Sequence, residues 1–362
     1  MKAVVVTPGV KHSARVIEVP TPKPGPGEVR VRVHRVGIDG TDIEIDRAEY
    51  GQAPPGDSHL IIGHESFGQI DEAGPGVQGF AVGDQVVALV RRPDDCQPCC
   101  SGEPDMCVKG EYTERGIKGR HGYLSQFYTE SPEYLVKLPR ELSEVGVLLE
   151  PLTVVEKGFR HAWALQTRMR KWQPRRALIL GAGPVGLLGA LLARLRGLDT
   201  IVYGRDPNAA ISARVGQIGA RYVAALDEQG KEVHHLGKLP QELGPLDFIL
   251  EATGAATVAI GAMRIIGPDG VLCLASVTGG EAPMEICAAC LNLELVLGNR
   301  VIFGTVNANR VDFVDGIEHL AQARTRFPGW LEALITRRVP LERFREAFER
   351  KPGDVKVVVE IG

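Results

Sequence analysis

The sequence has no long apolar run and no large excess of charge of one sign. No apolar segment approaches the roughly 20 residues that a membrane-spanning helix needs. A net charge of −3 provides no basic face for nucleic acid or an anionic membrane. Residues 1–8 lack the length and cleavage site of a secretory signal and predict a first strand instead. We therefore expect a cytoplasmic protein with neither a nucleic-acid nor a membrane partner.

Cysteine is scarce, and it is not spread as a disulfide framework would be. Four of the seven cysteines fall within twelve residues: Cys96, Cys99, Cys100 and Cys107. Disulfide frameworks are typical of shorter secreted chains, whereas such a cluster in a reducing compartment indicates a metal site. The others lie in apolar strand-like or helix-like contexts and are predicted to belong to the core, despite the C-x2-C spacing of the last two: Cys273, Cys287 and Cys290.

Internal repeats and low-complexity segments are also absent, so composition and periodicity indicate the organisation. A length of 362 residues favours two domains. The first third is β-rich, because Val29, Val31 and Val33 alternate with polar residues. Glycine corners between its short strands fit a small, strongly bent barrel. From about residue 175, strands and helices alternate, which predicts an α/β fold with a parallel, doubly wound sheet.

The periodicity places individual elements of the second half. Strands are expected at 177–180, 200–203, 248–250, 271–274 and 301–303. Helices are expected near 184–196, 208–218, 255–266, 284–292, 311–325 and 328–336. Residues 355–361 alternate with period two and predict a final strand that returns to the β-rich first domain.

A glycine turn joins the strand at 177–180 to the helix that follows. The turn consists of Gly181, Ala182, Gly183, Pro184, Val185 and Gly186. Gly181 permits the tight turn, Gly183 lets phosphates approach the backbone, and Gly186 lets the helix pack against the strand. The helix N-terminus then offers unpaired N–H groups to a pyrophosphate. With a second strand at 200–203, the motif predicts dinucleotide binding rather than a turn that only packs.

The residues after the second strand bear on the choice between NAD and NADP. Acidic side chains there bind the ribose hydroxyls of NAD, whereas arginine pairs with the 2′-phosphate of NADP. Arg205 and Asp206 lie nineteen and twenty residues after Gly186, so the spacing does not decide between them. Gly204 leaves room for a phosphate, which favours NADP, with NAD as the alternative. The alternative is that Arg205 and Asp206 are charged residues of a solvated loop with no role in cofactor binding.

Four separated pieces of the sequence carry possible metal ligands: residues 39–42, His64-Glu65, Glu114 and Glu150-Pro151. A catalytic zinc takes about three protein ligands and keeps one position open for substrate. Taken singly, His64 is more often a loop histidine and Glu150 a surface carboxylate. Sequence distance alone does not show that these pieces meet.

Taken together, the motifs resemble those of a known family. The segments are Gly37 to Asp42, Gly63-His64-Glu65, Gly83 to Val86, Leu149 to Leu152 and Gly181 to Gly186. On these the whole chain resembles the zinc-dependent medium-chain alcohol dehydrogenases. Most members have cysteine where this chain has Asp39. That aspartate, with segments 114–117 and 251–254, resembles the glucose 1-dehydrogenase branch.

The resemblance implies a fold and an assembly. It implies a bent, barrel-like (GroES-like) catalytic domain of residues 1–155 and 305–362, and a dinucleotide-binding (Rossmann) domain of residues 156–304. The active site is expected in the cleft. Related proteins are dimers or tetramers that often pair an edge strand, so a homo-oligomer joined through the run 294–303 is expected.

The resemblance also implies a catalytic zinc. It makes Asp39, His64 and Glu150 the candidate ligands, with Glu65 beside the metal. Carboxylate in place of thiolate gives a harder site, at which zinc binds less tightly and manganese or magnesium compete. Thr41 matches the hydroxyl residue that begins the proton relay. Its alternative is an N-cap for a helix over 41–47, and both can hold.

The implied reaction is NAD(P)-dependent oxidation of the anomeric hydroxyl of β-D-glucose, with galactose or xylose as further sugars, to the lactone. The residues expected to hydrogen-bond the sugar are Glu65, Glu114, Glu150 and Asn307, with Thr41 at the reacting hydroxyl. Asn307 also follows a predicted strand end, where dinucleotides bind, although it is equally interpreted as a turn residue. The alternatives are a dehydrogenase of another secondary alcohol, such as a polyol or threonine, and a metal-free nucleotide-binding protein.

The family's structural zinc lobe has four cysteines in the pattern C-x2-C-x2-C-x7-C. Cys96, Cys99 and Cys107 match the last three, and Pro93 stands at the first position. Three thiolates bind zinc, but a fourth ligand is missing from the pattern. The candidates for it are Glu111, Cys100, Asp94 and Asp95, and an empty, reduced loop is the alternative.

Overall fold

The computed structural model describes residues 1–278 and 283–362, and the chain divides into two compact units. The first unit comprises Met1–Thr153, Asn307–Ala321 and Leu331–Gly362. The second comprises Val154–Val306 and Gln322–Trp330. Among the described residues, no helix has the length and apolar character needed to cross a membrane.

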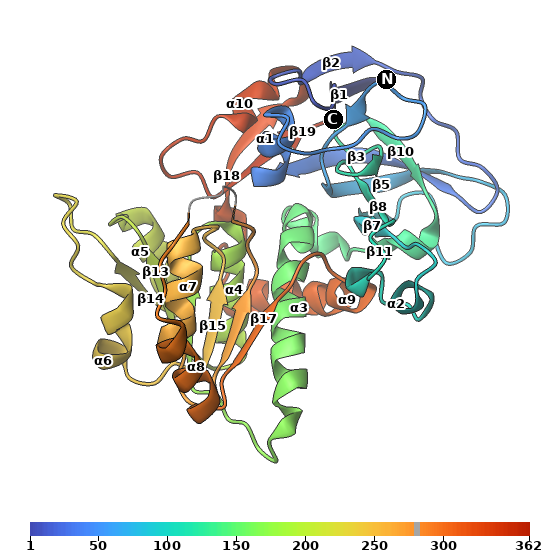
Figure 1. Ribbon diagram of the computed structural model, residues 1–362. Coiled ribbons are helices and arrows are strands. Elements are labelled where there is room, and N and C mark those ends of the chain that lie inside the picture. The colour runs from blue at the N-terminus through green and yellow to red at the C-terminus, as the bar shows by residue number, and fades with distance from the viewer. Residues whose placement is uncertain (279–282) are drawn as a thin grey trace. The chain divides into compact units, whose positions relative to one another are not determined.

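The main sheet of the first unit is built around its longest strand, β3 (Val29–Ile38). Its strands follow the order β11-β6-β5-β3-β19-β18, and β10 also pairs with β3 (Figure 1). The other strands are β5 (Glu65–Ala73), β6 (Gln85–Ala88), β10 (Phe127–Glu130), β11 (Leu135–Lys137), β18 (Ile335–Pro340) and β19 (Lys356–Glu360). Two smaller sheets contain β1 (Lys2–Val6), β2 (Arg15–Glu18) and β4 (Leu60–Ile61), and β7 (Arg91–Arg92), β8 (Thr113–Arg115) and β9 (Gly119–Arg120).

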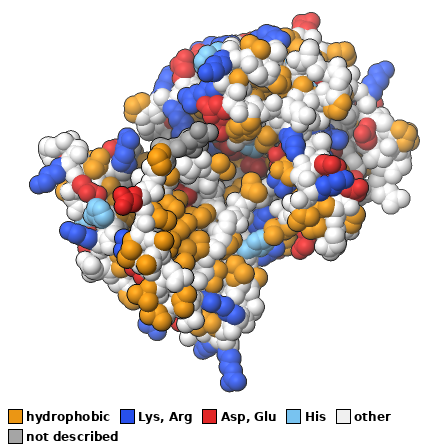
Figure 2. Space-filling model, in the orientation of Figure 1, with side chains coloured by type: hydrophobic (Ala, Val, Ile, Leu, Met, Phe, Trp, Pro, Cys, Tyr) orange, Lys and Arg blue, Asp and Glu red, His pale blue; other side chains and the backbone are white. Residues whose placement is uncertain are grey.

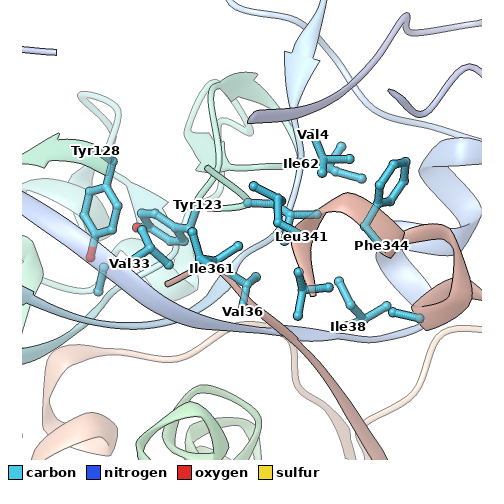
Figure 3. Close-up of a cluster of buried hydrophobic side chains, with 14 of the residues drawn as sticks. Val4, Val33, Val36, Ile38, Ile62, Tyr123, Tyr128, Leu341, Phe344 and Ile361 are labelled. Carbon is cyan, nitrogen blue, oxygen red and sulfur yellow. The ribbon is translucent and has the colours of Figure 1, made fainter. Parts of the chain in front are cut away.

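The core of the first unit joins both ends of the chain. Figure 3 shows Val4 and Ile62 beside Leu341 and Phe344. All four side chains are at most 4% exposed, and burying such a side chain stabilises the fold by about 1.5–3 kcal/mol. This packing fixes the C-terminal segment against the N-terminal strands.

The predicted return of the last strand is confirmed, but the helix predicted at 328–336 is wrong. β19 runs antiparallel to β3, with Val357 opposite Ile38. The segment before it forms a single 3-10 turn at Glu332–Leu334 and then β18, which pairs parallel with β19. Residues 328–331 form a turn in which Gly329 has a φ of +77°, and strand pairing takes only Ile335 and Thr336 of the predicted helix into β18. The short helices of the first unit are α1 (Gly40–Asp46), α2 (Gln97–Cys100) and α10 (Arg345–Phe348).

The second unit contains the predicted parallel sheet. Its strand order is β14-β13-β12-β15-β16-β17 (Figure 1). The strands are β12 (Arg176–Leu180), β13 (Asp199–Gly204), β14 (Arg221–Ala224), β15 (Phe248–Glu251), β16 (Val271–Leu274) and β17 (Val301–Gly304). The helices between them are α4 (Pro184–Leu195), α5 (Ala209–Gln217), α6 (Leu239–Leu243), α7 (Ala256–Ile265) and α8 (Ala288–Leu297). The strand order reverses beside β12, at the point where doubly wound sheets bind dinucleotides.

Two longer helices are α3 (Leu149–Leu165) and α9 (Arg310–Arg326).

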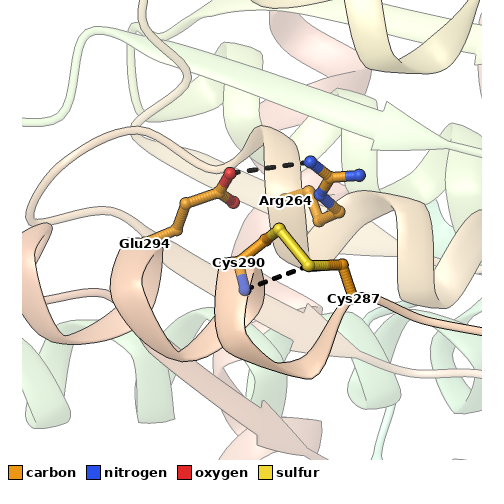
Figure 4. Close-up of a disulfide and its surroundings, with 4 residues drawn as sticks. All are labelled: Arg264, Cys287, Cys290 and Glu294. Carbon is orange, nitrogen blue, oxygen red and sulfur yellow. Dashed lines mark hydrogen bonds and ion pairs between the residues drawn. A yellow bond between two sulfur atoms is a disulfide. The ribbon is translucent and has the colours of Figure 1, made fainter.

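Two predictions near α8 are corrected. The helix begins at Ala288 rather than 284, and it includes Glu294, so only residues 301–303 of the predicted edge run 294–303 lie in a strand, β17. Cys273 is buried as predicted. Cys287 and Cys290 are not in the core: they form a disulfide at the exposed first turn of α8 (Figure 4). Their apolar neighbours belong to a helix that carries several exposed hydrophobic side chains.

Candidate active site

Asp39 lies where β3 passes into α1. Its side chain caps the helix, and Oδ1 accepts the backbone N–H groups of Thr41 at 2.8 Å and Asp42 at 3.4 Å. A helix N-terminus favours a carboxylate in this position. The predicted capping role of Thr41 for a helix over 41–47 is therefore wrong. The Thr41 hydroxyl instead donates to Asp39 Oδ2 at 3.2 Å.

His64 reaches the same point from the neighbouring strand. It directly precedes β5, which pairs antiparallel with β3. Gly63 turns the chain with a φ of +86°, a conformation that favours glycine. The Gly63 N–H donates to Asp42 Oδ1 at 3.1 Å, and His64 Nε2 lies 3.5 Å from Asp39 Oδ2. The turn at Gly63 and the cap at Asp39 thus hold the imidazole beside the carboxylate.

Glu65 is buried and paired with a lysine from the far end of the chain. The Lys356 ammonium forms an ion pair with the Glu65 carboxylate, and it donates to the carbonyl oxygen of Ile38 at 3.3 Å. The side chain of Lys356 is 1% exposed and that of Glu65 2%. Because β19 pairs with β3, with Val357 opposite Ile38, Lys356 lies close to the end of β3 that Asp39 follows.

Glu150 completes the cluster from the start of α3, where it is 8% exposed. Ligand atoms of His64, Glu65 and Glu150 all lie within 4.8 Å of one another. Asp39, Asp42 and His64 form a second group with the same property. Because His64 belongs to both groups, the structure gathers the other three predicted residues, Asp39, Glu65 and Glu150, around it.

Burial and mutual repulsion shape the protonation of this cluster. Burial raises the pKa of Glu150 to about 8 and that of Asp42 to about 7. Burial alone would also raise the pKa of Asp39, but the charge of His64 outweighs it and holds that pKa well below its usual range. The opposite balance raises the pKa of His64, because its carboxylate neighbours outweigh its burial. The side chains alone therefore supply too little positive charge to keep every carboxylate ionised.

A divalent cation suits this donor set. Within the described residues, one histidine and one lysine face four buried or half-buried carboxylates: Asp39, Asp42, Glu65 and Glu150. A buried charge is costly unless it is paired, and His64 Nδ1 is buried with no hydrogen-bond partner. The set offers oxygen and nitrogen without thiolate, which suits zinc as well as the harder manganese and magnesium ions.

Glu114 and Asn307 meet each other in a separate group. Glu114 Oε1 accepts the Asn307 amide at 3.0 Å and the Arg91 guanidinium at 2.9–3.0 Å. Glu114 is 9% exposed, and Asn307 has a φ of +59°. The arginine and the amide together fix the orientation of this carboxylate. A carboxylate and an amide held in this way suit a ligand with several hydroxyls.

The glycine turn of the second unit has the expected steric requirements. Gly181 has a φ of +106°, and a Cβ there would lie 2.8 Å from the carbonyl oxygen of Ala252. A Cβ at Gly186 would lie 2.1 Å from the carbonyl oxygen of Gly181. Gly183 faces open space and caps α4, whose first residues are Pro184 and Val185. The turn therefore presents bare backbone at a helix N-terminus, which suits a pyrophosphate.

Arg205 and Asp206 follow β13 as an exposed ion pair, with 2.8 Å between Arg205 Nε and Asp206 Oδ2. The space that a side chain at Gly204 would fill is occupied by Tyr222. A Cβ at Gly204 would lie 2.2 Å from the Tyr222 hydroxyl, which donates to the Asp206 carbonyl. Gly204 is thus required for packing against Tyr222, and Arg205 alone favours the 2′-phosphate.

An acidic side chain in the cysteine-rich loop lies where a fourth metal ligand is needed. Ligand atoms of Asp94, Cys96, Cys99 and Cys107 all lie within 4.8 Å of one another. Asp94 Oδ2 lies 3.0 Å from the Cys107 sulfur. The other candidates have partners elsewhere: Asp95 and Glu111 both pair with Lys109, and the Cys100 sulfur contacts the Asp95 carbonyl. Of the four candidates, the geometry favours Asp94.

Comparison with known proteins assigns the family. Residues 25–140 match the alcohol dehydrogenase GroES-like domain, and residues 143–361 match the glucose dehydrogenase C-terminus. A glucose 1-dehydrogenase of Methanocella arvoryzae is 45% identical over 365 residues and covers 100% of both chains. This chain belongs to the glucose dehydrogenase family. The prediction of a medium-chain alcohol dehydrogenase of the glucose branch is thereby confirmed.

Other members of the glucose dehydrogenase family agree over the full length. A glucose 1-dehydrogenase of Caldivirga maquilingensis is 41% identical over 100% of this chain and 99% of its own. The structure of Haloferax mediterranei glucose dehydrogenase in complex with NADP, zinc and gluconolactone matches with a TM-score of 0.90 at 34% identity, covering 100% of this chain and 99% of that one. These matches confirm the predicted fold class of a GroES-like domain with a Rossmann domain.

Several residues of this family member were not predicted as part of a site. Lys356 joins the cluster around His64, and Arg91 holds Glu114. Asp42 also lies in that cluster, although it was predicted only as part of the segment 39–42. Lys356 interrupts an apolar run of valines, and a lone lysine there was the available indication. In the second unit, Glu251 ends β15 and accepts the Thr253 N–H at 2.7 Å. It thereby fixes the loop beside the glycine turn.

Proposed function

We propose that this chain is a glucose 1-dehydrogenase that oxidises the anomeric hydroxyl of β-D-glucose to the lactone, with NADP as the preferred hydride acceptor. The observation that carries the proposal is the buried carboxylate–imidazole cluster around His64, to which Asp39 contributes a carboxylate. The first unit would bind metal and sugar, and the second the dinucleotide. The full-length similarity to glucose 1-dehydrogenases supports this assignment.

Asp39, His64 and Glu150 would hold the catalytic zinc, with Glu65 beside it. When bound, zinc polarises the substrate hydroxyl and the oxidised nicotinamide accepts the hydride. The chain's own contribution is to keep the donors in place. The α1 N-terminus orients Asp39, and Lys356 holds the Glu65 carboxylate. Fixed donors of this kind reduce the reorganisation that catalysis requires.

Thr41 would begin the path by which the proton leaves. Its hydroxyl donates to Asp39 Oδ2 at 3.2 Å, which places the oxygen next to a candidate ligand. A hydroxyl both donates and accepts a hydrogen bond, so it can accept a proton from the substrate side while it passes its own onward. The hydroxyl is the essential feature, and we expect serine to replace it better than valine.

Sugar recognition would come from fixed carboxylates and an amide. Glu114 and Asn307 are oriented by each other and by Arg91, and Glu65 and Glu150 lie beside His64. Each buried hydroxyl without a partner costs about 1–3 kcal/mol. Several preoriented acceptors therefore favour a polyhydroxylated substrate over a simple alcohol. Asn307 would contact the dinucleotide as well as the sugar.

NADP binding would combine the glycine turn with Arg205. Gly181, Gly183, Pro184, Val185 and Gly186 would surround the pyrophosphate. Arg205 is paired with Asp206 and its side chain is 81% exposed, so it can turn to the 2′-phosphate at little cost. Asp206 would then bind the ribose of NAD when that cofactor is used. Dual cofactor use with a preference for NADP follows.

The exposed side of α8 supports an oligomer. Figure 2 shows hydrophobic side chains gathered over the part of the second unit that contains α7 and α8. Leu293, Val296 and Leu297 are 58–74% exposed, and β17 lies at the end of the sheet with a free edge. Free sheet edges are normally covered. We propose that two copies pair through β17 and α8, and sedimentation as a monomer would contradict it.

The lobe of Cys96, Cys99 and Cys107 would hold a structural zinc, with Asp94 as the fourth ligand. The ligand atoms of these four residues lie close together. They are mostly sulfur atoms, whereas the ligand atoms of the catalytic set are mostly carboxylate oxygens. Three thiolates and one carboxylate suit zinc.

A substrate panel tests the activity. Initial rates are measured with NADP and with NAD for glucose, galactose, xylose, sorbitol and threonine, before and after chelation and zinc addition. The proposal predicts the highest kcat/KM for glucose with NADP, lost on chelation and restored by zinc. Faster turnover of sorbitol or threonine would indicate another alcohol dehydrogenase. Cofactor binding without turnover or metal would indicate a nucleotide-binding protein.

A further inference from the structure

Cys287 and Cys290 form a pair that neither the metal sites nor the reaction uses. Cys287 is the N-cap of α8 and Cys290 lies in its first turn, with their Cα atoms 5.3 Å apart. The Cys287 sulfur accepts the backbone N–H of Cys290 at 3.3 Å, as Figure 4 shows. The two residues are joined as a disulfide. This is a C-x2-C motif at a helix N-terminus, beside a parallel sheet.

The pair is accessible to reagents in solution. Cys287 is exposed and Cys290 is half-buried. Cys273 in the adjacent strand β16 differs in both respects, because it is buried and burial raises the pKa of its thiol to about 12. Reactivity of a cysteine requires both access and thiolate character. Of these three cysteines in the second unit, Cys287 is the most accessible.

A purely structural role explains this disulfide poorly. A cross-link stabilises a fold mainly by restricting the unfolded chain, and its effect grows with the length of the closed loop. The sequence separation here is only three residues, which is near the lower limit. The first turn also has a cap without the cross-link, because the Cys287 sulfur accepts an N–H group of that turn.

The surroundings favour a thiolate at Cys287. The N-terminus of a ten-residue helix carries a partial positive charge and unpaired N–H groups. Arg264 lies beside the pair in Figure 4. The one carboxylate drawn there, Glu294, is balanced by Arg264 at 3.8 Å and by Arg300 at 3.2 Å. The helix N-terminus and Arg264 therefore favour a negative charge on the Cys287 sulfur, and the exposed Glu285, two residues before it, opposes that charge.

We propose that Cys287 and Cys290 are a redox-active pair that exchanges with external dithiols, either small molecules or dithiol proteins. An external thiolate attacks the exposed Cys287 sulfur, the S–S bond breaks, and Cys290 leaves with the electron pair and takes up a proton. The second thiol of the reductant then displaces Cys287, so that the external dithiol becomes a disulfide. Two electrons and two protons pass to the protein. The reverse sequence restores the protein disulfide.

Alkylation of the full-length protein in its native state tests this proposal. The variants Cys290→Ser and Cys287→Ser each leave one thiol of the pair, and iodoacetamide labelling is followed by peptide mass spectrometry. We expect the Cys287 thiol to react at least about tenfold faster at neutral pH, with a midpoint below the value of about 8.5 for a free cysteine. Equal rates, or a midpoint at or above that value, would overturn the proposal.

Equilibration of the unsubstituted protein with mixtures of reduced and oxidised dithiothreitol gives the second arm. We expect the fraction of the pair reduced to follow the reagent ratio as one two-electron couple. The variant Cys273→Ala is the matched control, and it should leave this titration unchanged. Two thiols that never join, or a disulfide that the reagent does not reduce in the folded protein, would equally overturn the proposal.

Discussion

Two buried charge clusters in the first unit have opposite imbalances. Around His64, four carboxylates face one imidazole and one ammonium group. Around Glu130, one carboxylate that is 1% exposed faces three guanidinium groups: Arg92, Arg115 and Arg120. Both clusters lie in the first unit, so they differ mainly in the sign of the excess charge and in the groups that compensate it.

The arginine-rich cluster stabilises most of its charge within the chain, although Arg92 Nε and Arg120 Nε are buried without a hydrogen-bond partner. Arg115 donates to the carbonyl oxygens of Thr129 at 2.6 Å and His121 at 3.1 Å, and Arg92 donates to that of Leu89 at 2.9 Å. Arg92 also lies over the Tyr134 ring at 4.0 Å. Neutral acceptors and aromatic faces thus stabilise the excess positive charge.

The carboxylate-rich cluster does not find an equivalent set of neutral donors. Burial raises the pKa of Glu150 and of Asp42, and His64 Nδ1 is without a hydrogen-bond partner. A cation from outside the chain would correct this imbalance. The difference supports the proposal that the cluster around His64 binds a metal, whereas the cluster around Glu130 is structural.

The largest expected effect follows from removing the shared ligand of the carboxylate-rich cluster. His64→Ala should lower kcat/KM for glucose by at least about 1,000-fold, because metal polarisation of the hydroxyl is worth several kcal/mol. Steady-state kinetics with saturating NADP measure it. The control is His34→Ala, which removes a half-buried histidine of β3. It should leave kcat/KM within about twofold of the original value.

Glu130→Gln should have the next largest effect, on stability rather than on chemistry. The substitution leaves buried guanidinium groups without a counter-charge, which costs about 3–5 kcal/mol of unfolding free energy. Chemical denaturation with zinc present measures the loss. Glu133→Gln changes an exposed carboxylate nearby and should cost less than about 0.5 kcal/mol. If Glu130→Gln lost metal, the assignment of a purely structural role to the cluster around Glu130 would be contradicted.

Lys356→Met should cost less than Glu130→Gln, about 3 kcal/mol, because it leaves Glu65 buried without its partner. The cost should be larger in chelated protein than in zinc-loaded protein, since the metal supplies positive charge that the lysine no longer provides. Denaturation curves in both states measure the difference. The double variant with Glu65→Leu should recover part of the loss, and equal costs in the two states would contradict the account.

Acid should weaken the arginine-rich cluster with a defined sign. Burial alone would raise the pKa of Glu130, but the arginines outweigh it and lower it. Its contribution is therefore fully present above its unfolded pKa of about 4.3 and is lost as pH falls through the lower folded value. From about pH 5 downward, the original protein should lose up to about 1.4 kcal/mol per pH unit more than Glu130→Gln. Parallel pH curves for the two proteins would contradict this assignment.

Local sequence carried much of the fold and part of the site. The glycine turn and the alternation of strands and helices depend on neighbouring residues, and both were predictable. Asp39 and His64 were predictable as separate pieces. They meet because β3 and β5 are antiparallel neighbours, a pairing that short-range patterns do not encode.

The remaining features depend on distant partners. Lys356 joins the cluster across 291 residues from Glu65 (356 minus 65), and its strand is buried on both faces, so alternation gave no indication of its direction. The helical period predicted 328–336, but residues 328–334 form turns and β18 begins at Ile335, where it pairs with β19. Cys287 was assigned to the core from its apolar neighbours, which lie on a helix with exposed hydrophobic residues.

The zinc content of the purified protein tests the central claim most directly. Elemental analysis is made on the original chain, His64→Ala and Cys99→Ser after exhaustive dialysis. The account predicts one zinc in the cluster around His64 and one in the loop of Cys96, Cys99 and Cys107. His64→Ala should lose one zinc together with activity, and Cys99→Ser should lose the other while it keeps glucose oxidation. Full zinc content in His64→Ala, or activity without any bound metal, would contradict the account.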